Sequence, residues 1–301
     1  MENNFTPGRD DDDLPFQFRP KPVSDEKRIQ SWHSIANGIA ERMVFIRRRR
    51  KVFFSVAATF VLALGALWFF NTRDTMPLVV EYKTSFGQVK IIMLPDSSRL
   101  VLNANSSVKI PQQWEEAGDR QVWLDGEAYF EVAKKITTRQ KFVVHTAQVD
   151  VEVLGTKFNV NTRRSESVVA LVEGKVQLTI KGKGIRIIEK ISKPVVVLKP
   201  GEIAKVDSSL NVHVSEDANV DHYSGWVKNE YHFDDTSLGA VAKMIEDVYG
   251  YKMIFSDSSL ISRSISGDLR ATNIQEFVQV LQATLNLKMS IENKTIIVSQ
   301  P

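Results

Sequence analysis

The sequence predicts a single-pass membrane protein with a short helical cytoplasmic tail, an all-β domain outside the membrane and a small α+β domain after it. Three observations predict this fold class. Residues 52–70 form an uncharged apolar run, and residues 78–215 carry many short β-type runs between turn signals. Residues 225–301 then switch to alternating strand and helix patterns.

The composition already excludes several kinds of protein. Hydrophobic residues make up 43% of the 301 residues and charged residues 25%, as in globular chains rather than wholly disordered ones. There is no cysteine, which excludes a disulfide framework, a cysteine-ligated metal and a thiol nucleophile. The net charge of +3 gives no overall basic excess, so direct binding to nucleic acid is not expected.

Residues 52–70 are predicted to cross a membrane. The nineteen residues carry no charge, and at about 1.5 Å per residue they would span roughly 28 Å, close to a bilayer core of about 30 Å. Trp68, Phe69 and Phe70 at one end are typical of an interfacial aromatic belt. A buried helix of a soluble domain is disfavoured by the length of the run. A cleaved signal peptide is disfavoured because the run lies deep in the chain and no small-x-small site follows.

A basic cluster sets the orientation of this segment. The residues directly before it are Arg47, Arg48, Arg49, Arg50 and Lys51, whereas the other flank has Arg73 offset by Asp74. The positive-inside rule therefore puts the N-terminus in the cytoplasm and the larger part outside, in the periplasm of a bacterial cell. A nucleic-acid patch is the alternative interpretation. Beside a membrane helix, however, the cluster is better explained as a topology anchor that also contacts anionic lipid of the inner membrane.

The cytoplasmic tail divides into two parts. Residues 1–23 contain four prolines and an acidic run and are predicted to be disordered. Residues 24–51 are predicted to form an amphipathic helix ending in the basic stop, because apolar residues recur at steps of three and four. The residues expected to contact a partner are Ile29, Trp32, Ile35, Ile39 and Met43. A tail this short has no core of its own, so this face needs a protein groove or the membrane interface. A mere continuation of the membrane helix remains the alternative.

The segment 78–215 reads as an all-β domain. Twelve short runs rich in Val, Ile, Leu and aromatic residues alternate with Gly, Pro and Asp signals, and no convincing helix interrupts them. This pattern predicts a sandwich, a jelly roll or a solenoid. No fixed period marks the segment as a repeat array.

Six ordered motifs in this segment resemble the FecR family. They are LPDSSRLVLNANSSVKIP (94–111), VWLDGEAYFEVAK (122–134), KFVVHT (141–146), VEVLGTKFNV (151–160), VALVEGKVQL (169–178) and LKPGEIAKV (198–206). FecR-type proteins are single-pass inner-membrane anti-sigma regulators. They pair with an extracytoplasmic-function sigma factor and a TonB-dependent outer-membrane transducer, and some members are cut by an intramembrane protease. The resemblance implies these partners and a signal that enters through the periplasmic domains.

The tail departs from the family pattern. Many members carry a longer cytoplasmic anti-sigma domain, whereas here 46 residues precede the basic cluster. A single-helix clasp on the sigma factor and a tail that also activates it are both open. The expected contact residues come from the apolar stripe and are not carried over from the family. The alternative function is a membrane-anchored periplasmic scaffold or sensor without a sigma partner.

The last segment, residues 225–301, is predicted to be a small α+β domain with the order β-α-β, a short strand, then α-β-β. Gly250 stops the first helix, and Thr272 with Gln275 is read as a capping box that opens the second. A hairpin closes the segment across Asn293 and Lys294. The pattern resembles the C-terminal domain of longer FecR-like proteins, similar to the secretin/TonB short N-terminal module, which binds proteins.

Catalytic and metal motifs are absent from the sequence. There is no GxSxG, P-loop, GxGxxG or HExxH, so the protein is not predicted to be an enzyme or to carry a cofactor. The carboxylates Asp125, Glu127 and Glu131 are interpreted as solvated positions rather than as a catalytic pair. Of the five histidines, those at 213, 222 and 232 are spaced by nine and ten residues, unlike a metal motif, and each is read as a satisfied surface or core residue.

Overall fold

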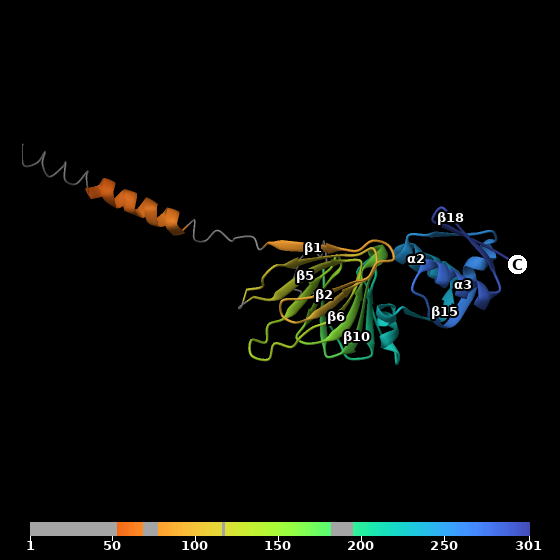
Figure 1. Cartoon of the computed structure of the whole chain (residues 1–301). Coiled ribbons are helices and arrows are strands. Elements are labelled where there is room, and N and C mark those ends of the chain that lie inside the picture. Colours follow the sequence, from red (N-terminus) through yellow and green to blue (C-terminus); the bar gives the residue numbers. More distant parts are fainter. Residues whose placement is uncertain (1–52, 69–77, 116–117, 182–194) are drawn as a thin grey trace, which may run out of the picture. The chain divides into compact units, whose positions relative to one another are not determined.

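The computed structural model describes residues 53–68, 78–115, 118–181 and 195–301 (Figure 1). The chain divides into two compact units, Met1–Thr75 and Met76–Pro301. The predicted disordered segment, the amphipathic tail helix with its five contact residues and the basic cluster all lie outside the described residues.

In the first unit, residues 53–68 are helical and their side chains are exposed. The hydroxyl of Thr59 donates to the carbonyl of Ser55 at 2.9 Å, so the helix itself accommodates this polar side chain. Among the described residues, no helix combines the length and the apolar character needed to cross a membrane. The crossing by residues 52–70 stays a prediction.

The second unit begins with fourteen described strands in two seven-stranded sheets. The first sheet contains, in spatial order, β1 (Val79–Lys83), β4 (Ser107–Pro111), β5 (Arg120–Asp125), β7 (Phe142–His145), β8 (Val149–Val153), β11 (Val176–Ile180) and β12 (Val195–Leu198). The second contains β14 (Val212–Glu216), β13 (Glu202–Val206), β10 (Ser167–Glu173), β9 (Lys157–Asn161), β6 (Glu127–Glu131), β3 (Arg99–Leu102) and β2 (Lys90–Met93). Neighbouring strands are antiparallel except for the parallel pair β5–β7.

One hydrophobic core fills the space between these two sheets. Phe130 on β6 and Phe158 on β9 are fully buried, and their rings stack at 5.0 Å. Phe142 on β7, in the opposite sheet, meets the ring of Phe130 edge-on at 6.1 Å. The structure therefore confirms an all-β domain, and of the three predicted architectures it has the sandwich.

The C-terminal part has its own core. Its elements are β15 (Glu230–Ser237), α2 (Leu238–Tyr249), β16 (Lys252–Phe255), β17 (Ser264–Arg270), α3 (Ile274–Leu285), β18 (Lys288–Glu292) and β19 (Thr295–Ser299). Strands β15 and β17 form one small sheet, and β16, β19 and β18 form another. The fully buried Phe277 on α3 lies at the centre, against the rings of Tyr231, Phe233 and Tyr249. The small α+β fold predicted for this part is confirmed.

Most local signals in this part are confirmed, and one is wrong. Gly250 caps α2 with φ +73°, as predicted. The box that opens α3 lies one residue later than predicted. Asn273 accepts from the Glu276 amide at 3.0 Å, and the Glu276 carboxylate accepts from the amide and hydroxyl of Thr272 at 2.8 Å each. The carboxylate of Glu276 accepts more strongly than the neutral amide of Gln275 would, which favours this register.

The tryptophans take three different roles. Trp114 packs on the sandwich core, and Trp226 is buried on a short helix, η3 (Val220–Lys228), that connects the two parts. Trp123 is instead 41% exposed and stacks on His145. Alternation along β5 sends its neighbours Val122 and Leu124 inward and Trp123 outward.

Gly126 makes the tight corner between β5 and β6. Its φ is +99°, and a Cβ there would lie 2.8 Å from the Cα of Ser106. Gly201 also has a positive φ, +88°, but there the nearest heavy atom to a Cβ would be 3.8 Å away. Both glycines therefore have a positive φ, but only at Gly126 would a Cβ collide with a neighbouring residue.

We expect Gly201→Ala to lower the free energy of unfolding by about 1–3 kcal/mol, the cost of a strained backbone conformation. Gly126→Ala adds a collision with the Ser106 backbone, so its loss should be larger by at least about 1 kcal/mol. Urea denaturation of both variants measures the difference. Equal losses for the two variants would contradict the steric explanation.

Candidate functional site

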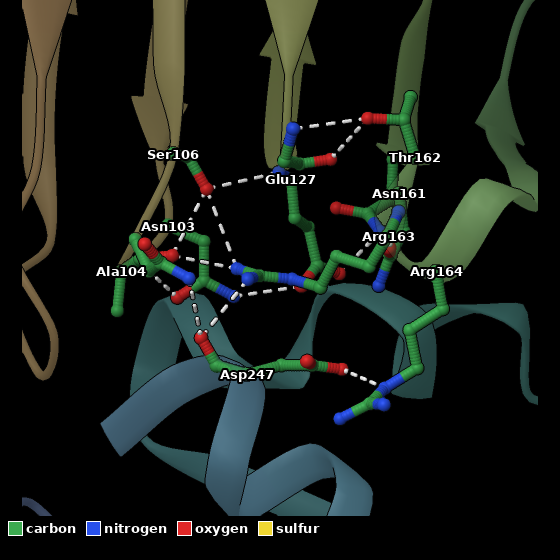
Figure 2. Close-up of polar contacts among 12 residues, drawn as sticks. Asn103, Ala104, Ser106, Glu127, Asn161, Thr162, Arg163, Arg164 and Asp247 are labelled. Carbon is green, nitrogen blue, oxygen red and sulfur yellow. Dashed lines mark hydrogen bonds and ion pairs between the residues drawn. The ribbon is translucent and has the colours of Figure 1, made fainter. Parts of the chain in front are cut away.

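A polar junction joins the sandwich to the C-terminal end of α2 (Figure 2). It is built on a short turn, η2 (Arg163–Ser165), that follows β9. The Arg163 amide donates to the Asn161 side chain at 3.0 Å, and Arg164 and Ser165 adopt positive φ values of 56° and 59°. Two consecutive left-handed residues are uncommon outside glycine, and such strain is often found at functional sites.

Arg163 is the central residue of the junction. Its side chain is only 10% exposed. One Nη donates to the carbonyl of Asp247 on α2 at 3.0 Å, and the other donates to the carbonyl of Ala104 at 2.6 Å in the sandwich. The same nitrogen lies 3.3 Å from the Ser106 hydroxyl. One guanidinium therefore hydrogen-bonds both parts of the unit.

The sandwich caps the C-terminal end of α2. A helix leaves its last carbonyls without partners, and that end carries a partial negative charge. The last turn of α2 has no basic residue. Its carbonyls accept instead from the sandwich: Asp247 from Arg163 and, at 3.3 Å, from Asn105, and Val248 from the Gly87 amide at 2.8 Å. Cations at a helix C-terminus contribute about 0.3–2 kcal/mol, more where they are partly buried.

Arg164 makes the outer part of the junction. Its Nε donates to the Asp247 carboxylate and its Nη2 to the Glu246 carboxylate, both at 2.8 Å. The hydrogen bond from Arg164 lowers the pKa of Glu246 below its ordinary value. The side chains of Arg164 and Glu246 are about 40% exposed and that of Asp247 is 22% exposed, so solvent screens both pairs and each is expected to contribute less than the buried contacts.

Glu127 lies behind Arg163 and is buried. Its two oxygens accept from the side-chain amides of Asn103 at 2.8 Å and Asn159 at 2.9 Å. The Nε of Arg163 lies 3.9 Å away, an ion pair without a hydrogen bond. Burial raises the pKa of Glu127 above its ordinary value, and the Arg163 charge and the two amides oppose that rise.

The three carboxylates considered for catalysis do not come together. Asp125 is exposed at the end of β5, and the Gly126 corner puts Glu127 on the next strand. Glu131 pairs with Arg99 at 3.1 Å. The interpretation as solvated positions is correct for Asp125 and wrong for Glu127, whose burial follows from its place in the junction.

An apolar contact stands beside the polar one. Trp226 on η3 is 8% exposed and packs against Val101 on β3 and Tyr129 on β6. The hydroxyls of Tyr231 and Tyr249 meet at 3.0 Å next to it. The short connecting helix is therefore part of the packing between the two cores rather than a free linker.

Sequence reasoning missed the residues that make this junction. Arg163 and Arg164 follow a strand in the sequence NTRR, and nothing in their spacing points to acceptors more than eighty residues later. The histidine interpretation is also incomplete. The structure brings His222 and His232 together with Asp268, and His213 is outside that cluster. The sigma-contact residues predicted for the tail lie outside the described part, so they stay a prediction.

The second unit is therefore a two-domain fold, a β-sandwich followed by a small α+β domain whose first helix is capped by loops of the sandwich. Two family models match these two domains in the same order. The family model described as FecR protein matches residues 80–177, and the model described as FecR, C-terminal, matches residues 230–298. The chain belongs to the FecR family, with the FecR-type C-terminal domain. The sandwich itself continues beyond the first match, through β12, β13 and β14.

Two solved structures share this architecture. Both are crystal structures, at 1.65 and 2.50 Å resolution, of a protein from Parabacteroides distasonis ATCC 8503 that is described as a candidate anti-sigma factor. Each matches with a TM-score of 0.60 and 22% identity over 74% of this chain, and over 99% and 100% of the crystallised chains. At this identity the likeness supports the fold. A search of curated proteins gives no match.

The two neighbouring arginines allow a matched test of the junction. We expect Arg163→Ala to lower the free energy of unfolding by about 3–5 kcal/mol, because it leaves Glu127 buried without its cation. Arg164→Ala should cost no more than about 1 kcal/mol. Chemical denaturation gives both values, and hydrogen exchange of α2 should rise strongly only in the first variant. Similar losses of unfolding free energy in both variants would show that the burial of Arg163 does not determine its contribution to stability.

Glu127 should impose a pH dependence on stability. Because its pKa is raised in the folded chain, the folded state holds more protons than the unfolded state above the ordinary value of 4.5. The contribution of Glu127 to stability therefore falls as pH rises through the interval between the ordinary and the raised pKa. Glu127→Gln removes the ionisation, so its stability relative to the parent chain should increase with pH over that interval.

Urea denaturation between pH 4 and pH 8 tests this expectation. Glu131→Gln is the control, because Glu131 is partly exposed and paired with Arg99. A constant difference between Glu127→Gln and the parent chain across this range would mean that Glu127 does not titrate as its burial predicts.

Proposed function

We propose that the protein is an inner-membrane anti-sigma regulator. In this proposal the cytoplasmic tail binds an extracytoplasmic-function sigma factor, and residues 52–70 cross the membrane. The unit Met76–Pro301 receives a signal in the periplasm from a TonB-dependent transducer. The observation that carries the proposal is the order of features along one chain: a basic cluster, an apolar run, then a FecR match and a FecR C-terminal match.

The apolar helical segment supports the membrane part of the proposal. Phe53, Leu62 and Trp68 are each more than 70% exposed within residues 53–68. Large apolar side chains exposed along a whole helix are unfavourable in water and favourable in lipid. The adjoining five cations of the sequence fit a cytoplasmic flank.

The C-terminal domain supports the periplasmic part of the proposal. Ile254 on β16 and Ile297 on β19 are register partners, and both are more than a third exposed. This pair gives the outer face of the small sheet an apolar contact surface on which a protein module could dock. The proposed role is regulatory, as the match to the FecR family suggests.

A regulator of this kind needs two states that its partners distinguish. The junction offers them, since the α2 carbonyls are capped when the sandwich and the C-terminal domain are packed together and lose those donors when they separate. A transducer module that favours one state would shift the population, and an intramembrane protease could make the shift irreversible.

The tail gives the sharpest test of this function. We expect the full-length chain to co-purify with the sigma factor encoded nearest its gene and to repress a reporter that depends on that factor. Trp32→Ala removes the largest apolar side chain of the predicted contact face and should weaken binding at least about tenfold. Gln30→Ala, off the apolar stripe of the same predicted helix, is the control and should leave binding unchanged.

Two outcomes would overturn the sigma proposal. One is the absence of binding to any candidate sigma factor, with helix formation only on lipid, which would favour a membrane-anchored scaffold or sensor. The other is equal loss of binding in Trp32→Ala and Gln30→Ala, which would mean that the apolar stripe is not the contact face.

A further inference from the structure

His222, His232 and Asp268 form a compact cluster at the connection between the sandwich and the C-terminal domain. Strand pairing places His232 on β15 directly opposite Asp268 on β17, and their Nδ1 and Oδ1 atoms lie 2.7 Å apart. His222 comes from η3, and its ring stacks on that of His232 at 3.7 Å. One ligand atom from each residue lies within 4.8 Å of the others.

We propose that this cluster binds a divalent transition-metal ion of the kind that prefers imidazole, with Zn²⁺ as the representative ion. Two imidazole nitrogens and one carboxylate oxygen are a common ligand set for such ions, and water can complete a tetrahedron. Metal–ligand bonds of about 2.0–2.2 Å place tetrahedral ligand atoms about 3.3–3.6 Å apart. In the cluster His232 Nδ1 and Asp268 Oδ1 are 2.7 Å apart and no ligand atom lies more than 4.8 Å from the others, so movements on the order of 1 Å would bring the three to that spacing.

The ring geometry sets where an ion would bind. The His222 and His232 rings stack at 3.7 Å with 23° between their planes, and imidazole binds a metal through the nitrogen lone pair in the ring plane. An ion would therefore lie at the nitrogen edges of the stacked pair, beside the Asp268 carboxylate whose Oδ1 is 2.7 Å from His232 Nδ1.

The site is also accessible. The cluster lies on the wall of a cleft of about 700 Å³, which Asp221 and Glu230 also line. His232 and Asp268 are exposed and His222 is half-buried, so these side chains can reorient to bind an ion without disturbing a hydrophobic core. Hard cations such as Mg²⁺ prefer all-oxygen sites, so they should bind poorly here.

Binding would fasten the connecting helix to the C-terminal sheet. His222 lies on η3, four residues before the Trp226 that packs on Val101 and Tyr129. His232 and Asp268 lie on the two strands of the sheet that begins the C-terminal domain. An ion held by all three would restrict movement between the two cores, a role that does not depend on the sigma proposal.

Isothermal titration of the full-length chain with ZnCl₂ tests the site. We expect one ion per chain with a micromolar dissociation constant, and no heat from MgCl₂. His222→Ala and His232→Ala should each weaken binding at least about tenfold, and Asp268→Asn by a similar factor. His213→Ala removes an exposed histidine outside the cluster and should leave binding unchanged.

Two further measurements separate a built site from nonspecific binding. Co²⁺ should give visible d–d absorption bands in the parent chain and lose them in the His222→Ala/His232→Ala double variant. Hydrogen exchange in η3 should slow on Zn²⁺ addition in the parent chain and in His213→Ala. Unchanged Zn²⁺ binding in the double variant, or no stoichiometric binding by a folded parent chain, would overturn the proposal, and neither result bears on sigma binding.

Discussion

The buried guanidinium of Arg163 is the contact on which the relation between the two cores depends. It donates to Ala104 in the sandwich and to Asp247 at the end of α2, and its Nε lies 3.9 Å from the carboxylate of the buried Glu127. Each of these groups would be costly to bury without it. The helix end also accepts from Asn105 and Gly87, and Glu127 also accepts from Asn103 and Asn159. Arg163 therefore links groups that each have further donors, in a network whose hydrogen bonds can strengthen one another.

The same arrangement explains why the two cores form one compact unit although each has its own hydrophobic centre. The cores meet over a small apolar contact at Trp226 and over this polar junction. Polar contacts between cores are directional, and they lose their value once water can replace the partner. The junction is thus specific in geometry without being irreversible.

Local signals in the sequence predict most of the fold. Alternating apolar residues predict the strands, and Gly126 and Gly250 mark corners because their backbone angles are hard for other residues. The sequence does not distinguish a sandwich from a jelly roll or a solenoid. Alternation of apolar and polar residues shows which face of a strand is buried, but not which strands pair with it or pack against it. The capping box was misplaced for a similar reason. Two overlapping Thr/Asn-x-x-Gln/Glu patterns compete, and only the charge on Glu276 separates them.

The candidate sites could not be predicted from the sequence for a different reason. Arg163 contacts Asp247, and His222 lies near Asp268, only in the folded chain. Contacts between residues so far apart in sequence produce no periodic pattern, and sequence motifs describe only ligands that lie close together along the chain. Glu127 shows the limit most clearly. Its neighbours in sequence predict a solvated strand residue, but it is 8% exposed, bonded to the side-chain amides of Asn103 and Asn159 and 3.9 Å from Arg163.

The location of the caps constrains how a partner could separate the two cores. When the sandwich leaves, the carbonyls of Asp247 and Val248 lose donors that α2 cannot replace from its own last turn. Water could hydrogen-bond these carbonyls, but the helix end would lose the favourable interaction with the positive charges of Arg163 and Arg164. A partner that brings its own basic group or backbone amides to this helix end would avoid that cost. Separation of the cores is therefore easiest when the incoming module competes for the end of α2 rather than for the sandwich alone.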